Sequence, residues 1–236
     1  MTVLARDMVE RVRNSPLSCE PWPSDTGIQY YWDQQIAFAR FPDQEKYHPR
    51  LIERTLELEQ DDRFSHRFIA HVGGSKIFNL EQWECPEADL IYFRALAFFR
   101  EITRSQTAAA DNSWATTYHR GDYCAPHSHP RAMASVVYLL NVEQGGADAG
   151  GEFRIADPRV GMSCQERVGY VTTPFGPGNV DGTMILFPGS AVHYVEPYWG
   201  DEPRITLAWN INPKPLAESN TGLEEAKRGA SVGNQP

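Results

Sequence analysis

The segment "GTMILFPGSAVHYVEPYWGDEPRITLAWNI", residues 182–211, contains three short runs of β-forming residues separated by turns. Pro188 and Gly189 divide the first run from the second, and a stretch rich in Gly, Asp and Pro precedes the third. Runs of this length between such breaks are typical of strands in all-β folds. The segment therefore predicts three successive strands.

Four further runs of the same kind lie upstream. They are "SWATTYH" (113–119), "MASVVYLLNV" (133–142), "GEFRIAD" (151–157) and "VGYVTT" (168–173). Seven short strands within about 100 residues are typical of a sandwich, a barrel or a jelly roll.

The chain before residue 112 has a different pattern, which predicts helices. Residues 43–64 carry apolar side chains at helical spacing among charges, and residues 85–105 open with Pro86 and present a broad apolar face. Residues 28–41 are rich in β-formers and predict one or two strands. We therefore expect a mainly β fold with N-terminal helices.

The length of 236 residues predicts one domain. Residues 1–28 read as an N-terminal arm, irregular or forming a short helix. The single domain is expected over 29–215, with its β core at about 112–213. The polar composition of residues 216–236 indicates a flexible tail.

Composition limits the partners and the compartment. The net charge of −9 argues against nucleic acid and anionic membranes, because both favour basic surfaces. The sequence shows no membrane-length apolar run and no apolar signal-peptide core, so we expect a cytoplasmic protein. The four cysteines are scattered and are expected to be free thiols. Homodimer formation is left open.

Three histidines form a candidate metal site. In "YHRGDYCAPHSHPR" (118–131), His127 and His129 would share one face of an extended strand. His193, from a distant strand, would complete a three-ligand face. The alternative is that the His-x-His pair has no ligand role. His71 and His119 are also present, and the count of histidines alone does not select His193 as the third ligand. His119, two residues before Gly121, is also compatible with a solvated or hydrogen-bonded turn histidine.

The last strand carries a candidate anion-binding arginine. Ile205, Leu207, Trp209 and Ile211 alternate with Arg204, Thr206, Ala208 and Asn210. If the apolar set packs against the helices, Arg204 points into the roll, where a buried guanidinium needs an anion such as a carboxylate. The alternative is an edge strand whose polar side faces solvent.

The order of these features resembles the Fe(II)/2-oxoglutarate-dependent dioxygenases, in particular the prolyl-hydroxylase-like branch and a group of bacterial 2-oxoglutarate-Fe(II) oxygenases. The resemblance covers about residues 112–213. It implies a double-stranded β-helix, a jelly-roll or cupin-like fold with helices packed on one sheet. It also implies an enzyme that uses Fe(II), 2-oxoglutarate as cosubstrate, and O2.

The resemblance also implies roles for individual residues. His127 and His193 match two iron ligands, and Arg204 with Thr206 matches the pair that holds the distal carboxylate of 2-oxoglutarate. Tyr138 matches a tyrosine that bonds the same carboxylate. Tyr118 resembles a pocket tyrosine, whereas Tyr123 is expected to be ordinary packing.

His129 occupies the position where the family usually has an Asp or Glu ligand. We expect His129 to bind the metal, because imidazole is a good iron ligand. The alternative is that water or a nearby carboxylate completes the site, with Asp122 and Glu152 as conceivable substitutes.

The expected reaction is hydroxylation of an unactivated C–H bond, with release of succinate and CO2. The expected substrate is a small molecule such as an amino acid or a related acid. Arg131 and Trp114 are candidate substrate contacts, and residues 172–182 are a candidate lid or merely a long loop. Three alternatives remain: a prolyl-type protein hydroxylase, a three-histidine cupin-like dioxygenase that does not use 2-oxoglutarate, and a non-enzymatic binding module.

Overall fold

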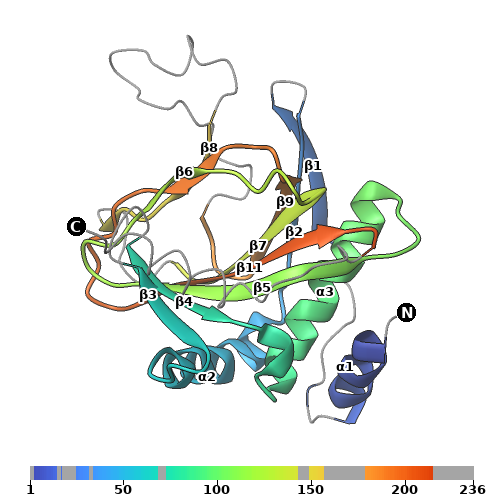
Figure 1. Cartoon of the computed structure of the whole chain (residues 1–236), viewed down its shortest axis with the longest axis horizontal. Coiled ribbons are helices and arrows are strands. Elements are labelled where there is room, and N and C mark those ends of the chain that lie inside the picture. The colour runs from blue at the N-terminus through green and yellow to red at the C-terminus, as the bar shows by residue number, and fades with distance from the viewer. Residues whose placement is uncertain are drawn as a thin grey trace, which may run out of the picture.

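Two antiparallel β-sheets and a layer of helices build the protein (Figure 1). The computed structural model describes residues 3–14, 17, 25–31, 34–68, 73–142, 149–156 and 179–214. The large sheet has the order β1 (Asp25–Tyr31), β2 (Gln34–Arg40), β9 (Thr183–Pro188), β7 (Ala134–Asn141), β11 (Arg204–Asn212), β5 (Ala109–Tyr118), β4 (Gly74–Phe78) and β3 (Ser65–Phe68). The small sheet has the order β6 (Cys124–His127), β10 (His193–Val195) and β8 (Phe153–Ile155).

Within the described ranges, three α-helices accompany the sheets. Figure 1 shows α2 (His48–Glu59) and α3 (Pro86–Thr103) on the face of the large sheet that is turned away from the small sheet. The helix α1 (Val3–Asn14) lies beside α3, where Met8 is buried and Arg11 forms an ion pair with Asp89. Two single 3-10 turns, Gln44–Lys46 and Leu80–Gln82, precede α2 and α3. In the described residues, no helix is long and apolar enough to cross a membrane.

The predicted mainly β fold with N-terminal helices is confirmed, and its arrangement is that of a double-stranded β-helix. The helix expected at 85–105 is α3, and the β-rich residues 28–41 form most of the β1–β2 hairpin. The helix expected at 43–64 is shorter, because the chain turns at Asp61, whose carboxylate accepts the Arg63 backbone N–H, and then enters β3.

Some predictions missed or lie outside the described residues. The strands β3 and β4 were not predicted, because each is only a few residues long and contains charged side chains. The run expected at 168–173, most of the candidate lid at 172–182 and the tail at 216–236 lie outside the described residues.

Two apolar cores lie on opposite faces of the large sheet. Ile205, Leu207, Trp209 and Ile211 pack in the core on the helix side, whereas Ala208 packs in the core inside the roll. Successive strand side chains point to opposite faces, so this division puts Arg204 and Thr206 inside the roll. The predicted division of this strand into two faces is confirmed.

A buried polar cluster joins the helices to the sheet. The His48 Nε2 atom and the Tyr138 hydroxyl lie 2.6 Å apart and share a hydrogen bond, and the Tyr47 hydroxyl lies 3.0 Å from the same oxygen. Nearby, the buried Arg94 is paired with Asp43. Burial lowers the pKa of His48 from 6.5 to about 4, so this imidazole is neutral in the folded protein near neutral pH.

The His48 imidazole should make the protein sensitive to acid. Below pH 6.5 the unfolded chain takes up a proton at His48, whereas the folded protein does so only near pH 4, so stability falls as the pH decreases. This effect amounts to about 2 kcal/mol between pH 7 and pH 5. The free energy of unfolding is measured with urea at pH 7 and at pH 5. Its decrease between the two pH values should be about 2 kcal/mol smaller in His48→Gln than in the wild type.

The matched control is Tyr138→Phe, which removes the hydrogen bond but leaves the imidazole. It should lower stability by similar amounts at both pH values. An unchanged acid dependence in His48→Gln would contradict the assignment.

Candidate metal centre

Strand pairing in the small sheet brings two of the predicted ligands together. His127 ends β6 and His193 begins β10, and the two residues are directly opposite each other in the antiparallel ladder. Side chains of opposite residues in such a ladder lie on the same face of the sheet. The two imidazole ring centres are accordingly 4.3 Å apart, although 65 residues separate His127 and His193 in the sequence.

His129 reaches the same point by a different route from the one expected. The strand β6 ends at His127, so His129 is not part of an extended strand. Its backbone N–H donates to the Gly189 carbonyl at 2.7 Å, and its carbonyl accepts the Ala132 N–H at 2.9 Å. These bonds hold a turn that places the His129 ring 5.0 Å from that of His127 and 5.2 Å from that of His193.

The three histidines form a set of convergent donors. One nitrogen of each ring lies within 4.8 Å of those of the other two. The Nδ1–H of His127 donates to the Ala125 carbonyl at 2.9 Å, and the Nδ1–H of His193 donates to the Ala191 carbonyl at 3.0 Å. These bonds leave Nε2 of both rings free of its proton, as metal coordination requires.

Burial keeps all three imidazoles neutral. It lowers the pKa of His129 to about 3 and that of His193 well below its ordinary value, and the pKa of His127 falls for the same reason. The positive charge of Lys76 contributes to each of these decreases. Three neutral imidazoles suit Fe, Zn, Cu or Ni rather than Mg or Ca.

Arg204 lies at the start of β11, inside the roll and 1% exposed. Its Nη1 and Nη2 atoms are both buried and have no hydrogen-bond partner among the residues that the structure describes. Its guanidinium carbon lies 5.3 Å from the ring centre of Tyr118, the residue paired with it on β5. Burial lowers the pKa of Arg204, which shows that this charge lacks full compensation.

Gly151 shapes the space around this guanidinium. Its φ of +72° favours glycine, and a Cβ at this position would lie 2.8 Å from Cδ of Arg204. The close approach of this backbone holds the arginine in place without covering its two terminal nitrogens. Thr206, on the same face of β11 as Arg204, is buried.

Tyr138 does not belong to this site. It is paired with Leu207 and lies in the core on the helix side, where it bonds His48, so it points away from Arg204. The reason is the register of β7, which turns Tyr138 to the helix face of the sheet and its neighbours Val137 and Leu139 into the roll. The expectation that Tyr138 binds the cosubstrate is therefore wrong.

The proposed carboxylate substitutes for His129 are engaged elsewhere. Asp122 accepts two hydrogen bonds from Arg67 and one from the His119 N–H. Glu152 forms an ion pair with Arg154. Within the described part of the chain, the potential metal-ligand cluster contains histidines alone.

The other predicted residues divide between the site and the surface. Trp114 is buried inside the roll, and its ring centre lies 5.6 Å from that of His129. Arg131 is exposed in the turn that follows His129. Tyr123, expected to be packed, is 41% exposed.

Sequence reasoning missed Lys76. This residue lies on β4, and its ammonium nitrogen is 4.9 Å from the Trp114 ring centre. A lone lysine in a short unpredicted strand carries no sequence signal. Only the structure brings it near the histidines.

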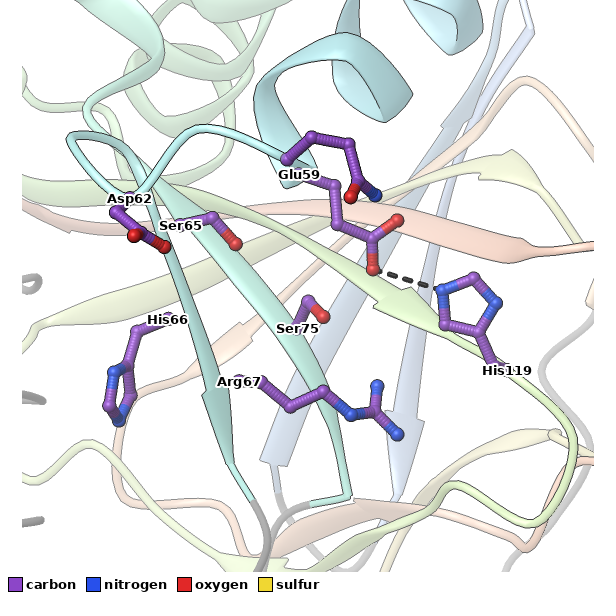
Figure 2. Close-up of a pocket in the computed structure, with 8 residues that line it drawn as sticks. Glu59, Asp62, Ser65, His66, Arg67, Ser75 and His119 are labelled. Atoms are coloured by element: carbon purple, nitrogen blue, oxygen red, sulfur yellow. Dashed lines mark hydrogen bonds and ion pairs between the residues drawn. The ribbon is translucent and has the colours of Figure 1, made fainter.

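A separate polar cavity of about 400 Å³ contains none of the three candidate ligands (Figure 2). It lies at the end of α2 beside β3 and β4, and its lining includes Glu59, Arg67, Ser75 and His119. The His119 Nε2 atom lies 2.9 Å from a Glu59 carboxylate oxygen. His119 is thus a hydrogen-bonded histidine outside the metal centre, and His71 lies outside the described residues.

Comparison with known proteins gives a family match over the part of the chain that contains the site. Residues 112–210, which contain the three histidines and Arg204, match a protein family described as "Putative 2OG-Fe(II) oxygenase". A search of curated protein sequences gives no match.

Solved structures share the fold at low sequence identity. The viral collagen prolyl hydroxylase of Paramecium bursaria Chlorella virus-1, in complex with 2OG, has a TM-score of 0.52 and 14% identity, over 74% of this chain and 94% of that one. A prolyl-4-hydroxylase of Pseudomonas putida has a TM-score of 0.50 and 16% identity, over 87% and 97%. The alpha-ketoglutarate-dependent carbocyclase SnoK from nogalamycin biosynthesis has a TM-score of 0.56 and 9% identity, over 77% and 81%.

The geometry predicts that each histidine contributes to metal affinity. His127→Ala, His129→Ala and His193→Ala should each weaken Fe(II) binding about tenfold or more, as measured anaerobically by competition with a chromophoric chelator. His129→Asp should keep the affinity, because a carboxylate is also an iron ligand. His119→Ala is the control and should bind as the wild type does. If His129→Ala bound Fe(II) as tightly as the wild type, His129 would not be a ligand and the centre would have only two.

Proposed function

We propose that this chain is a 2OG-Fe(II) oxygenase that oxidises an unactivated C–H bond of a small acid. In this proposal His127, His129 and His193 hold Fe(II), and Arg204 with Thr206 holds 2-oxoglutarate. The observation that carries the proposal is the buried guanidinium of Arg204, whose terminal nitrogens have no partner.

The residues present fit both groups. A buried guanidinium without a partner is unstable unless an anion meets it, and its planar fork matches a carboxylate with two parallel hydrogen bonds. Asp181 acts on Arg204 electrostatically and accepts a hydrogen bond from the Val142 N–H. The distal carboxylate of 2-oxoglutarate would satisfy the two free nitrogens of Arg204. The neutral imidazoles would coordinate the iron without losing protons first.

Fe(II) and 2-oxoglutarate, when bound, supply oxidation by O2: one oxygen atom enters the substrate, the other enters succinate, and the keto acid loses CO2. The protein orients the cosubstrate through Arg204 and excludes water. Phe187 and Phe153 pack against His193, and their ring centres lie 4.7 and 5.8 Å, respectively, from the centre of the imidazole. These apolar walls separate the reacting centre from bulk solvent.

A small-molecule substrate is supported by the surroundings of His129. Trp114 provides a flat apolar wall beside this ligand, suited to the carbon skeleton of a small substrate. Arg131, exposed in the next turn, remains a candidate contact for a substrate acid group. A prolyl-type protein hydroxylase would use the same core, and peptide-dependent formation of succinate would identify it.

The alternatives that lack 2-oxoglutarate are less well supported. A three-histidine dioxygenase of the cupin type would have no use for a buried, unpartnered arginine. A binding module without metal would have no reason to keep three neutral imidazoles convergent. Arg204 and the histidines together favour the oxygenase.

Anaerobic addition of Fe(II) and 2-oxoglutarate to the apo protein tests the proposal. The wild type should develop a visible metal-to-ligand charge-transfer band. In Arg204→Ala the affinity for 2-oxoglutarate should fall about tenfold or more, because a charge-assisted bidentate contact is lost. Arg63→Ala, which removes an exposed arginine, should leave the titration unchanged. The absence of a band in wild-type protein would refute the cosubstrate assignment.

A further inference from the structure

Lys76 is a cation inside the roll that the proposed chemistry does not use. It lies on β4, opposite Thr116 of β5, and Thr116 in turn lies opposite Thr206 of β11. Figure 1 shows β4, β5 and β11 as neighbours in the large sheet. Two residues further along, Phe78 is opposite Trp114, and both pack in the core inside the roll. Because alternate residues of a strand share a face, the Lys76 side chain is on the same face as the metal centre.

The contacts of the Lys76 ammonium are aromatic. Its nitrogen lies 4.9 Å from the ring centre of Trp114 and 5.6 Å from that of Phe68. In the part of the chain that the structure describes, Lys76 has no ion pair and no hydrogen bond to a side chain. Burial lowers the pKa of Lys76, as expected for an ammonium held without a counter-charge.

The same ammonium acts electrostatically on the three histidines. Its positive charge is the smallest of the causes that lower the pKa values of His127, His129 and His193. Trp114 connects them physically, because its ring lies beside both the Lys76 ammonium and the His129 ring.

The charges at the centre do not balance without another anion. With Fe(II) bound, the metal, Arg204 and Lys76 carry four positive charges. A 2-oxoglutarate dianion neutralises two of them, and the Asp181 carboxylate, which acts on Arg204, offsets a third. The usual carboxylate ligand would neutralise the fourth, but a neutral imidazole occupies that position here. A buried excess of positive charge favours an anionic ligand.

We propose that Lys76 binds the carboxylate of the substrate and so selects small carboxylic acids, with the carbon skeleton of the substrate lying against Trp114. This inference rests on the proposed oxygenase function and adds the residue that recognises the substrate. Lys76 is therefore a specificity-determining residue beside the His129 ligand.

Lys76 is separate from the cosubstrate arginine. The strands β4 and β11 lie on either side of β5, which puts the backbones of Lys76 and Thr206 about 10 Å apart. Arg204 lies a further two residues along β11, next to Tyr118 and Gly151. The two cations can thus serve two different anions.

Binding of paired probes tests the assignment. Anaerobic protein loaded with Fe(II) and saturating 2-oxoglutarate is titrated with a panel of small aliphatic and aromatic monocarboxylates and with the neutral carboxamide of each. Binding is followed by tryptophan fluorescence and by the shift of the charge-transfer band. In the wild type, at least one acid should bind about tenfold or more tightly than its amide.

Three variants locate the cation responsible. Lys76→Gln should remove the preference for the acid, leave amide binding unchanged and keep 2-oxoglutarate affinity within about twofold of the wild type. Lys76→Arg should keep much of the preference, because the charge remains. Arg131→Gln tests the other candidate contact for the acid group and should keep the preference for the acid, because in this proposal Lys76 binds the carboxylate.

Each contrary outcome is distinct. The proposal is wrong if no acid binds better than its amide, if the preference survives Lys76→Gln, or if it is lost in Arg131→Gln instead. A large loss of 2-oxoglutarate affinity in Lys76→Gln would assign Lys76 to the cosubstrate. Failure of the oxygenase proposal is recognised separately, because wild-type protein would then show no charge-transfer band. The fluorescence titrations would still report whether Lys76 distinguishes an acid from its amide.

Discussion

The antiparallel pairing of β6 with β10 is the constraint on which the site depends. It places His127 opposite His193, and neither residue could meet the other without that register. A shift of one residue in either strand would turn an imidazole to the opposite face of the small sheet. The Gly189 carbonyl, which accepts the His129 N–H, ties the turn after β6 to the end of β9, so the third imidazole depends on the large sheet as well.

The sequence allowed most of the core to be predicted, because its strands have clear patterns. The alternation along Arg204–Asn212 correctly separated the residues on the helix side from those inside the roll. The role expected for Tyr138 came from the family resemblance alone, and the register of β7 turns this residue to the helix side of the sheet. Lys76 was beyond prediction, since its proximity to Trp114 arises only from the pairing of β4 with β5.

The His129 position shows how a local prediction can be right for the wrong reason. Its proximity to His127 was expected from strand alternation, yet the strand ends at His127 and a hydrogen-bonded turn brings His129 into place. The electrostatic result is a centre made of neutral groups, next to the two cations Arg204 and Lys76. Such a centre has one negative charge fewer than a centre with a carboxylate ligand, so it favours a further anionic ligand more strongly.

Two peptide carbonyls fix the proton positions on the rings of His127 and His193. Each carbonyl belongs to the residue two positions before its histidine, Ala125 in one case and Ala191 in the other. The tautomer is therefore selected by the path of the main chain and not by a neighbouring acidic side chain. The groups that prepare the two nitrogens are main-chain carbonyls, so the side-chain identities at positions 125 and 191 do not by themselves reveal this selection.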